Sequence, residues 1–213
     1  MPFFINRPIM PLSAGITFAT FDPARKNTTA ILSGGNLTYA ATNGNAYSTA
    51  AVTVGKSSGK YYAELLCNAS NVSQDSAIGI ATGAFDFAAA TNLPGPDANG
   101  FSALRDGSIW GGSGVGGAWD GFGANILDAA IDFGAKLFWW RVNNGLWNSQ
   151  LNGGSGGDPA SGTFGYDFTS IGSAPFYFVV SGYGFSSPPT GFTANFGASA
   201  FTRTPPSGFV GLS

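Results

Sequence analysis

Catalysis in this chain would have to rely on acidic side chains, because the sequence contains no histidine. A glycosidase site needs two carboxylates about 5 to 9 Å apart. Glu64 is the only glutamate, and Asp128 and Asp132 come nearest to a pair because their spacing puts both on one face of a strand. A hydrophobic hairpin is nevertheless a poor environment for two charges. We therefore predict capping or turn roles for Asp128 and Asp132, and no catalytic pair.

Covalent and metal chemistry also lack their usual residues. Cys67 is the only cysteine and has no histidine to activate it, so we interpret it as a small core or strand-end residue. Because the chain has no histidine, it also lacks the commonest protein ligand of zinc and iron. The segments 97–100 and 106–108 lack the alternating acids and the closing glutamate of a calcium loop. We predict that the chain is not an enzyme and holds no metal or cofactor.

Binding chemistry is better represented, because two tryptophans accompany a glycine-rich loop at residues 111–123. In one interpretation, Trp110 and Trp119 pin this loop to the domain. In the other, they form an aromatic platform for a sugar or a protein partner, and Arg105 and Asp106 supply the polar groups. These four residues are the predicted partner-binding set of the loop face.

The charge pattern argues against nucleic acid as a partner. Only 9% of the residues are charged, the nine Lys and Arg are spread along the chain, and the formal net charge is -2. No basic footprint for a phosphate backbone results. Prolines 2, 8 and 11 interrupt the apolar start, and Gly or polar residues interrupt the other apolar runs. We therefore expect neither an export signal nor a membrane-spanning helix.

Short β-prone runs separated by turn residues fill the chain from Ile16 onward, without helical periodicity. The segment 126–147 is the strongest, because apolar and polar residues alternate at its start. In a strand, the adjacent Trp139 and Trp140 face opposite sides, so that one packs in the core and the other lies on the outer face. This pattern predicts an all-β fold. The predicted strands are 37–39, 52–54, 60–66, 76–81, 126–132, 137–142, 175–181 and 192–197.

Turn residues mark the ends of the strongest strands. Residues 133–136 are predicted to form a hairpin turn. Asn144-Gly145 is predicted as the tight-turn pair after the next strand, because both residues tolerate positive φ. A second glycine-rich loop at 153–165 is predicted to lie on the surface and, with the loop at 111–123, to form the variable part of a binding face.

Residues 1–14 are interpreted as an extended arm, and residues 15–213 as one domain. Three prolines limit the conformations that the arm loses when it docks. We expect the arm to attach the domain to an assembly. The alternative is that the arm folds back as an edge strand or covers the open end of the domain. The apolar anchors of the arm are Phe3, Phe4, Ile5, Ile9, Met10 and Leu12.

Several short motifs follow one another along the chain in a recognisable order. They include a Gly-Lys-Ser-Ser-Gly-Lys-Tyr-Tyr-Ala-Glu strand that ends at Glu64 and an Asn-Gly-x-Trp motif that ends at Trp147, and their shared order is more informative than any one of them. The full set is Phe21-Asp22-Pro23-Ala24, Leu37-Thr38, 55–64, Ile78-Gly79-Ile80, 131–139, 143–147, 193–197, Phe201 and 205–209.

In this order the motifs resemble the SPRY family, most of all the free-standing SPRY-like virion proteins of tailed bacteriophages. The resemblance covers roughly residues 18–209. It implies a two-sheet antiparallel β-sandwich, of the concanavalin-like jelly-roll kind, whose edge loops recognise a partner without catalysis. The arm before Ile16 and the two long glycine-rich loops depart from the family pattern.

The resemblance also implies a function. We expect a structural or decoration protein of a tailed-phage virion, assembled in the host cytoplasm and exposed on the head or tail. Its partners would be other capsid or tail proteins, in a homo-oligomer or a symmetric assembly. The alternative is a lectin-like or peptide-binding module that recognises a glycan or a protein on the host cell surface.

Overall fold

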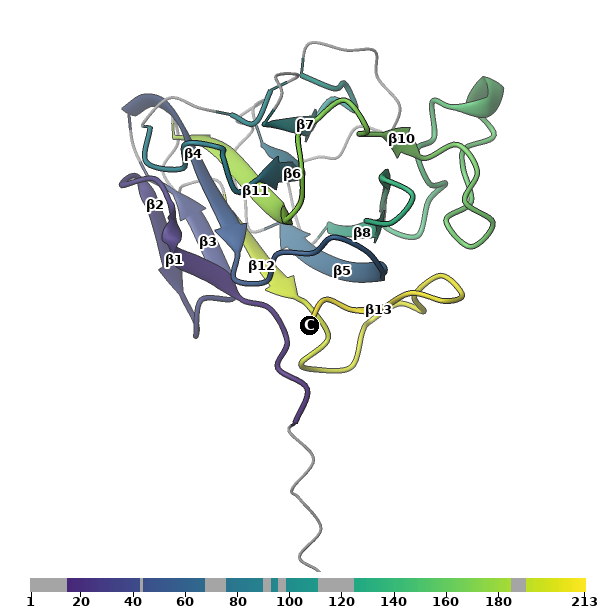
Figure 1. The fold of residues 1–213 in the computed structure, drawn as a ribbon, viewed down its shortest axis with the longest axis horizontal. Coiled ribbons are helices and arrows are strands. Elements are labelled where there is room, and N and C mark those ends of the chain that lie inside the picture. The colour runs from purple at the N-terminus through teal and green to yellow at the C-terminus, as the bar shows by residue number, and fades with distance from the viewer. Residues whose placement is uncertain are drawn as a thin grey trace, which may run out of the picture.

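The computed structural model describes residues 15–42, 44–67, 76–89, 93–95, 99–110, 125–184 and 191–213. Figure 1 shows the strands gathered into two sheets. Across these ranges the only helical element is a 3-10 turn at Asn152–Gly154, and no helix there is long and apolar enough to cross a membrane. The predicted two-sheet antiparallel β-sandwich is confirmed.

Five strands form one sheet and eight form the other. In order, the five-stranded sheet contains β1 (Phe21–Lys26), β4 (Gly44–Val52), β11 (Phe176–Gly184), β6 (Ala77–Thr82) and β7 (Gly100–Leu104). The eight-stranded sheet contains, in order, β10 (Tyr166–Asp167), β9 (Leu137–Val142), β8 (Ile126–Asp132), β5 (Lys60–Cys67), β12 (Gly191–Asn195), β3 (Thr38–Ala41) and β2 (Ala30–Ser33). Its eighth strand, β13 (Val210–Gly211), pairs in parallel with β5, whereas the pairs between neighbours in the two orders are antiparallel.

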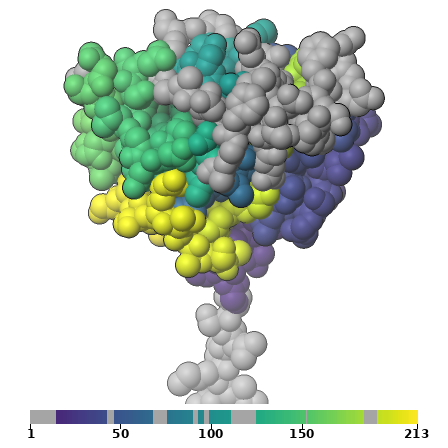
Figure 2. Space-filling view, turned by 180° about the vertical axis from the view of Figure 1, so that it is seen from behind, coloured from purple at the N-terminus to yellow at the C-terminus, as the bar shows by residue number. Residues whose placement is uncertain are grey.

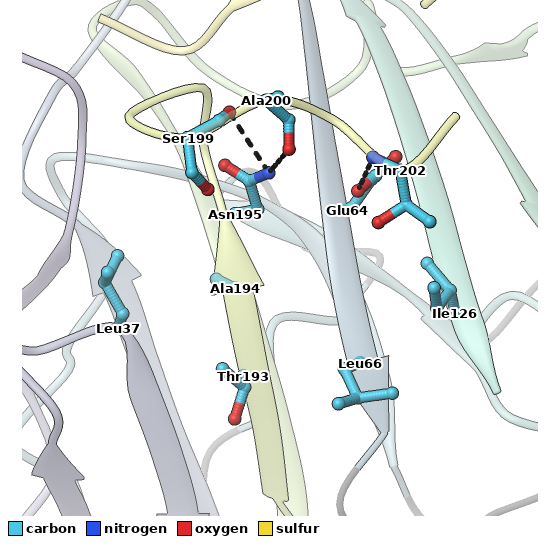
Figure 3. A pocket seen from close by; sticks show the side chains of 10 residues that line it. All are labelled: Leu37, Glu64, Leu66, Ile126, Thr193, Ala194, Asn195, Ser199, Ala200 and Thr202. Carbon is cyan, nitrogen blue, oxygen red and sulfur yellow. Dashed lines mark hydrogen bonds between the residues drawn. The ribbon is translucent and has the colours of Figure 1, made fainter. Parts of the chain in front are cut away.

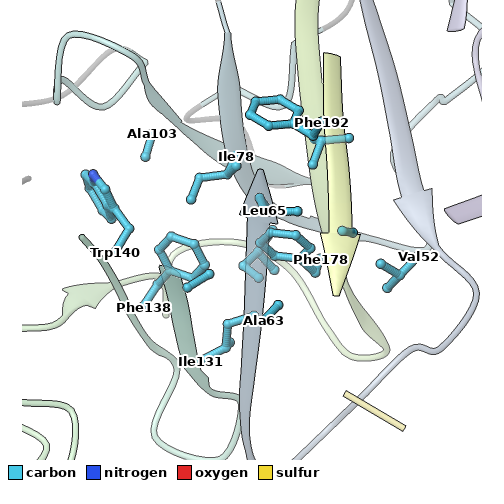
Figure 4. Packing of buried hydrophobic residues seen from close by; sticks show 14 of the residues in the cluster. Val52, Ala63, Leu65, Ile78, Ala103, Ile131, Phe138, Trp140, Phe178 and Phe192 are labelled. Carbon is cyan, nitrogen blue, oxygen red and sulfur yellow. The ribbon is translucent and has the colours of Figure 1, made fainter. Parts of the chain in front are cut away.

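The main hydrophobic core lies between the two sheets, because every second side chain of a strand points to the same side. Leu65 of β5, Phe178 of β11, and Phe138 and Trp140 of β9 are buried there together (Figure 4). The ring centroids of Phe138 and Trp140 are 5.7 Å apart, and those of Phe138 and Phe178 are 6.3 Å apart. Such aromatic pairs contribute about 0.5 to 1.5 kcal/mol each beyond the burial of their surface.

The two adjacent tryptophans divide between the two faces of β9 as predicted. Trp140 belongs to the main core, whereas Trp139 lies in a separate buried cluster on the outer face of the sheet. Its indole nitrogen donates a hydrogen bond to the carbonyl of Thr163 at 2.9 Å. A Cβ added at Gly165 would lie 2.7 Å from its ring. The second glycine-rich loop, residues 153–165, is therefore anchored to the sheet by Trp139.

The turn after β9 differs from the prediction by one residue. Positive φ angles occur at Asn143 (48°) and Asn144 (67°), and the amide of Gly145 donates to the carbonyl of Val142 at 2.8 Å. The central pair of the turn is thus Asn143-Asn144 and not Asn144-Gly145. Asparagine can occupy both positions because its short polar side chain tolerates the left-handed region.

Short or irregular strands escaped prediction. The predicted strand at 52–54 overlaps only the end of β4, because the small and polar residues 44–51 show no clear alternation. β1 contains Pro23, and β10 and β13 have two residues each, which is too short for a recognisable pattern. The strands β2 and β7 were missed as well.

The two ends of the domain are tied together. The amide of Ala19 donates to the carbonyl of Leu212 at 2.8 Å. The ring of Phe18 lies against Gly197 and Gly211, where an added Cβ would be 2.7 Å and 2.8 Å from its Cε1 atom. Figure 2 shows the first described residues, in purple, emerging beside the yellow C-terminal segment. The chain before residue 15 therefore enters the domain at this end.

Cys67 provides a test of the core. It ends β5 and is buried, as predicted, and burial raises the pKa of its thiol to about 12, with Arg105 lowering it in part. Because the thiolate is the reactive form, we expect no reaction of the native protein with iodoacetamide at about pH 8. Labelling should become complete when denaturant unfolds the domain, as measured by mass spectrometry. Rapid labelling of the native protein would contradict this position of the thiol.

Candidate functional site

The predicted loop-face residues Arg105 and Asp106 lie in the tight turn after β7, and Trp110 lies just beyond it, where its amide donates to the carbonyl of Ser102 at 2.9 Å. Asp106 accepts hydrogen bonds from the backbone amide of Ser108, at 2.8 Å, and from the hydroxyl of the same residue. Trp110 is 45% exposed, and a Cβ added at Gly95 would lie 2.7 Å from its indole. The carboxylate of Asp106 thus holds its own turn, while Trp110 presents an apolar surface to solvent.

The other predicted partner-binding residues lie outside the described part of the chain. This applies to Trp119 and to the first glycine-rich loop at 111–123. It applies equally to the arm at 1–14. The structure therefore places three of the four loop-face residues near one another and leaves the arm as a prediction. The arm anchors outside the described residues are Phe3, Phe4, Ile5, Ile9, Met10 and Leu12.

A second surface, which the sequence analysis did not identify, lies on the outer face of the eight-stranded sheet. Strand register places Arg141, Asp128, Glu64 and Asn195 side by side across β9, β8, β5 and β12. These side chains face away from the main core, because the core-facing residues of β5 are the alternate ones. We call these four residues the polar row.

Asp128 is the buried centre of the polar row. Its carboxylate accepts a hydrogen bond from Nε of Arg141 at 2.7 Å, and Nη1 of Arg203 lies 3.4 Å from its other oxygen. Burial raises the pKa of Asp128, and the guanidinium groups of Arg141 and Arg203 oppose this shift. The guanidinium of Arg141 also lies 4.4 Å from the ring centroid of Trp147. The hydrogen bond between Arg141 and Asp128 is charge-assisted, and such bonds are stronger than those between neutral groups.

Glu64 fixes the chain segment that crosses the polar row. Its two carboxylate oxygens accept hydrogen bonds from the backbone amides of Thr202, at 2.9 Å, and Arg203, at 2.7 Å. The hydroxyl of Tyr62 donates to the same carboxylate at 3.3 Å. We call residues 199–203 the cover, because in Figure 3 this segment crosses β5 near Glu64. Hydrogen bonds to the carboxylate of Glu64 and the ion pair between Arg203 and Asp128 thus hold the cover against the sheet.

The neighbouring carboxylates of Glu64 and Asp128 have structural roles. A catalytic base must reach the proton that it removes. The oxygens of Glu64 face the backbone amides of the cover, and those of Asp128 face two guanidinium groups. Both carboxylates are buried. The arrangement therefore suits the attachment of a chain segment better than proton transfer.

The roles predicted for the two aspartates of β8 are only partly correct. Asp132 accepts a hydrogen bond from the amide of Ala135 at 2.9 Å, so its turn role is confirmed. The capping or turn role predicted for Asp128 is wrong, because this residue forms a buried ion-pair network. Pairing the predicted strands 60–66 and 126–132 in antiparallel register would have placed Glu64 opposite Asp128.

An uncovered groove lies beside the polar row. Register places Ile126, Leu66 and Thr193 side by side, two residues along the strands from the polar row. Ser199 and Thr202 of the cover line the same groove, which has a volume of about 410 Å³ (Figure 3). Leu66 is 37% exposed. The groove therefore combines the aliphatic side chains of Leu66 and Ile126 with polar lining residues, which include Glu64 and Asn195 of the polar row.

The buried ion pair predicts a difference between two arginines. We expect Arg141→Met to lower the free energy of unfolding by about 3 kcal/mol, because it removes the closer partner of a fully buried carboxylate. Arg25→Met is the matched control, since Arg25 also contacts an aspartate, Asp22, and an aromatic ring, Tyr177, but is more exposed. It should cost less than about 1 kcal/mol. Urea unfolding measures both values, and equal losses would contradict the buried role of Asp128.

The same variant predicts a pH dependence. Without Arg141, the pKa of Asp128 in the folded state should rise further above its unfolded value. A folded state that holds a proton more tightly loses stability as the pH rises through the interval between the two pKa values. The destabilisation by Arg141→Met should therefore be larger at about pH 8 than at about pH 4. A loss that is independent of pH would contradict this coupling.

No protein-family model and no curated protein matches this sequence. Solved structures do match. The SPRY domain of human HERC1 matches with a TM-score of 0.57 and 13% sequence identity, over 82% of this chain and 96% of that domain. The PSpry domain of TRIM65 matches with a TM-score of 0.54 and 11% identity, over 84% and 92% of the two chains. Stonustoxin matches with a TM-score of 0.56 and 14% identity, over 84% of this chain and 27% of the toxin.

These similarities agree with the arrangement of the strands. At such low identity a structural match establishes the fold and not the activity. The two SPRY domains are matched over nearly their whole length, so the likeness extends to the complete sandwich and not to one hairpin. The chain therefore has the SPRY-like β-sandwich fold that the sequence motifs predict.

Proposed function

We propose that this chain is a non-catalytic protein-interaction module. The observation that carries the proposal is the SPRY-like fold, since three SPRY domains match over 92% to 98% of their own length. The sandwich is a rigid support with exposed apolar groups on two separate surfaces, Trp110 on the loop face and Leu66 in the groove. Rigid elements that present apolar groups beside polar ones suit the recognition of a protein partner.

The acidic side chains support a binding role over a catalytic one. In the part of the chain that the structure describes, each carboxylate is bonded to the protein's own backbone or to its own cations. Most of them hold turns, in which the carboxylate accepts a hydrogen bond from an amide two or three residues later. The described acidic residues are Asp22, Glu64, Asp86, Asp106, Asp128, Asp132, Asp158 and Asp167.

More specifically, we propose that the chain is a structural or decoration protein of a tailed-phage virion, attached through its N-terminal arm. The sequence motifs support it, together with the low charge and the apolar arm. The direction in which the chain leaves the domain supports it as well, because residues 15–17 are exposed and Ile16 is 74% exposed. An arm that starts from such a position can reach a neighbouring subunit. Mass spectrometry of purified particles tests the location, and absence of the chain from the particles would contradict it.

Deletion of the arm tests the attachment role. Removal of residues 1–14 should leave a soluble, β-rich domain with a nearly unchanged melting temperature, because the side chains of the two sheets form an extensive core within the described residues. The same deletion should prevent incorporation into the assembly. Thermal unfolding followed by circular dichroism and mass spectrometry of particles measure the two effects. A melting temperature that falls by several degrees, or aggregation, would instead favour an arm that covers the domain itself.

A second candidate function is a lectin-like or peptide-binding module that recognises the host cell surface. The exposed indole of Trp110 favours it, because exposed aromatic rings are the usual platform for sugars and for peptide side chains. We expect Trp110→Ala to reduce any signal on a glycan array at least tenfold without changing the melting temperature. Ile31→Ala, at an exposed residue of β2, is the control. An array without signal would count against this function.

A further inference from the structure

The groove on the outer face of the eight-stranded sheet has the features of a docking site for a short peptide segment, because exposed aliphatic side chains lie there among polar ones. Its floor is formed by Leu66 and Ile126, which are directly paired between β5 and β8, and by Thr193, which is paired with Leu66 from β12. The cover binds Glu64 and Asp128 but leaves this floor open, so that Leu66 remains 37% exposed. An occupant would remove aliphatic surface from water without breaking the ion pairs of the polar row.

The point at which the N-terminal arm enters the domain lies close to this groove. Phe18 packs against Gly197, and Ser199, only two residues later in the chain, lines the groove. Two residues span at most about 7 Å, so Phe18, four residues after the end of the arm, lies near the end of the groove wall. Figure 2 shows the start of the described chain beside the C-terminal segment that contains the cover.

The first described residues lead away from the domain. Residues 15–17 are exposed, and Ile16 is 74% exposed. Apart from the chain neighbours of Gly15, no heavy atom of the described residues lies within 4 Å of a Cβ added there. In Figure 1 this purple segment points away from the two sheets. An arm that returned to its own groove would have to reverse direction at once. An arm that continues outward meets a neighbouring molecule.

We propose that the groove receives the N-terminal arm of a second copy of this chain, an inference that rests on the proposed attachment role of the arm. The apolar residues nearest the domain, Ile9, Met10 and Leu12, occupy the floor beside Leu66. Fourteen residues reach up to about 46 to 50 Å when extended, which is enough to cross to a neighbour. Because each copy carries its arm beside its groove, two copies related by a two-fold axis exchange arms and form a closed dimer.

A pair of charge substitutions tests the groove in the full-length protein. Leu66→Glu places a carboxylate on the floor and should raise the dimer dissociation constant roughly a hundredfold. Ile31→Glu is the matched control, because Ile31 is a 51% exposed aliphatic residue of β2 in the same sheet. It should leave the dimer intact. Analytical ultracentrifugation measures association, and circular dichroism confirms that both variants fold.

A mixing experiment distinguishes exchange between copies from docking within one copy. One chain lacks residues 1–14 and carries Ser199→Cys, and the other is full-length and carries Met10→Cys together with Leu66→Glu. Both carry Cys67→Ala, so that the introduced thiols are the only ones. A disulfide-linked heterodimer should form under mild oxidation. Replacement of Ser199→Cys by Ser33→Cys, at the end of β2, should abolish it.

The possible results separate this inference from the proposed function. Dimers that are lost with Leu66→Glu and with arm deletion, together with the cross-link, support arm exchange. A monomeric wild-type protein overturns it. Dimers that persist in Leu66→Glu but disappear on arm deletion also overturn it, because the arm then docks elsewhere while its attachment role stands. If the arm-deleted chain still enters particles, the attachment role fails whatever the dimer does.

Discussion

The buried carboxylate of Asp128 is the constraint on which the outer face of the eight-stranded sheet depends. A charge with no exposed surface must be compensated within the protein, and here Arg141 and Arg203 compensate it from two different parts of the chain. Arg141 belongs to the neighbouring strand, whereas Arg203 belongs to the cover. The ion pairs therefore require the chain after β12 to lie across the sheet in one position.

That position determines what the surface offers to a partner. With the cover fixed, Glu64 and Asp128 are buried, while Ile126, Leu66 and Thr193 line an open groove. The strand register sets the distance between these two sets of residues, because Leu66 and Ile126 lie two residues from Glu64 and Asp128 on the same strands. The groove thus results from the positions of Glu64 on β5 and Asp128 on β8.

The sequence predicted those features that depend on local pattern. The hairpin of β8 and β9 and the division of Trp139 and Trp140 followed from alternation and turn residues. The groove and the polar row could not be predicted in the same way, because they depend on the register between β5, β12 and the β8–β9 hairpin, which are far apart in the sequence. The neighbouring positions of Glu64 and Asp128 emerge only when these strands are paired.

The hydrogen bond between Ala19 and Leu212 has a consequence for the architecture of longer proteins. A domain whose first and last residues lie side by side can be inserted into a surface loop of a host protein without forcing the loop ends apart. The same proximity makes the chain suitable for circular permutation, in which a short linker joins the old ends and new ends open in an exposed turn. The exposed tip of the β8–β9 turn, Gly134-Ala135, is one position for such a cut.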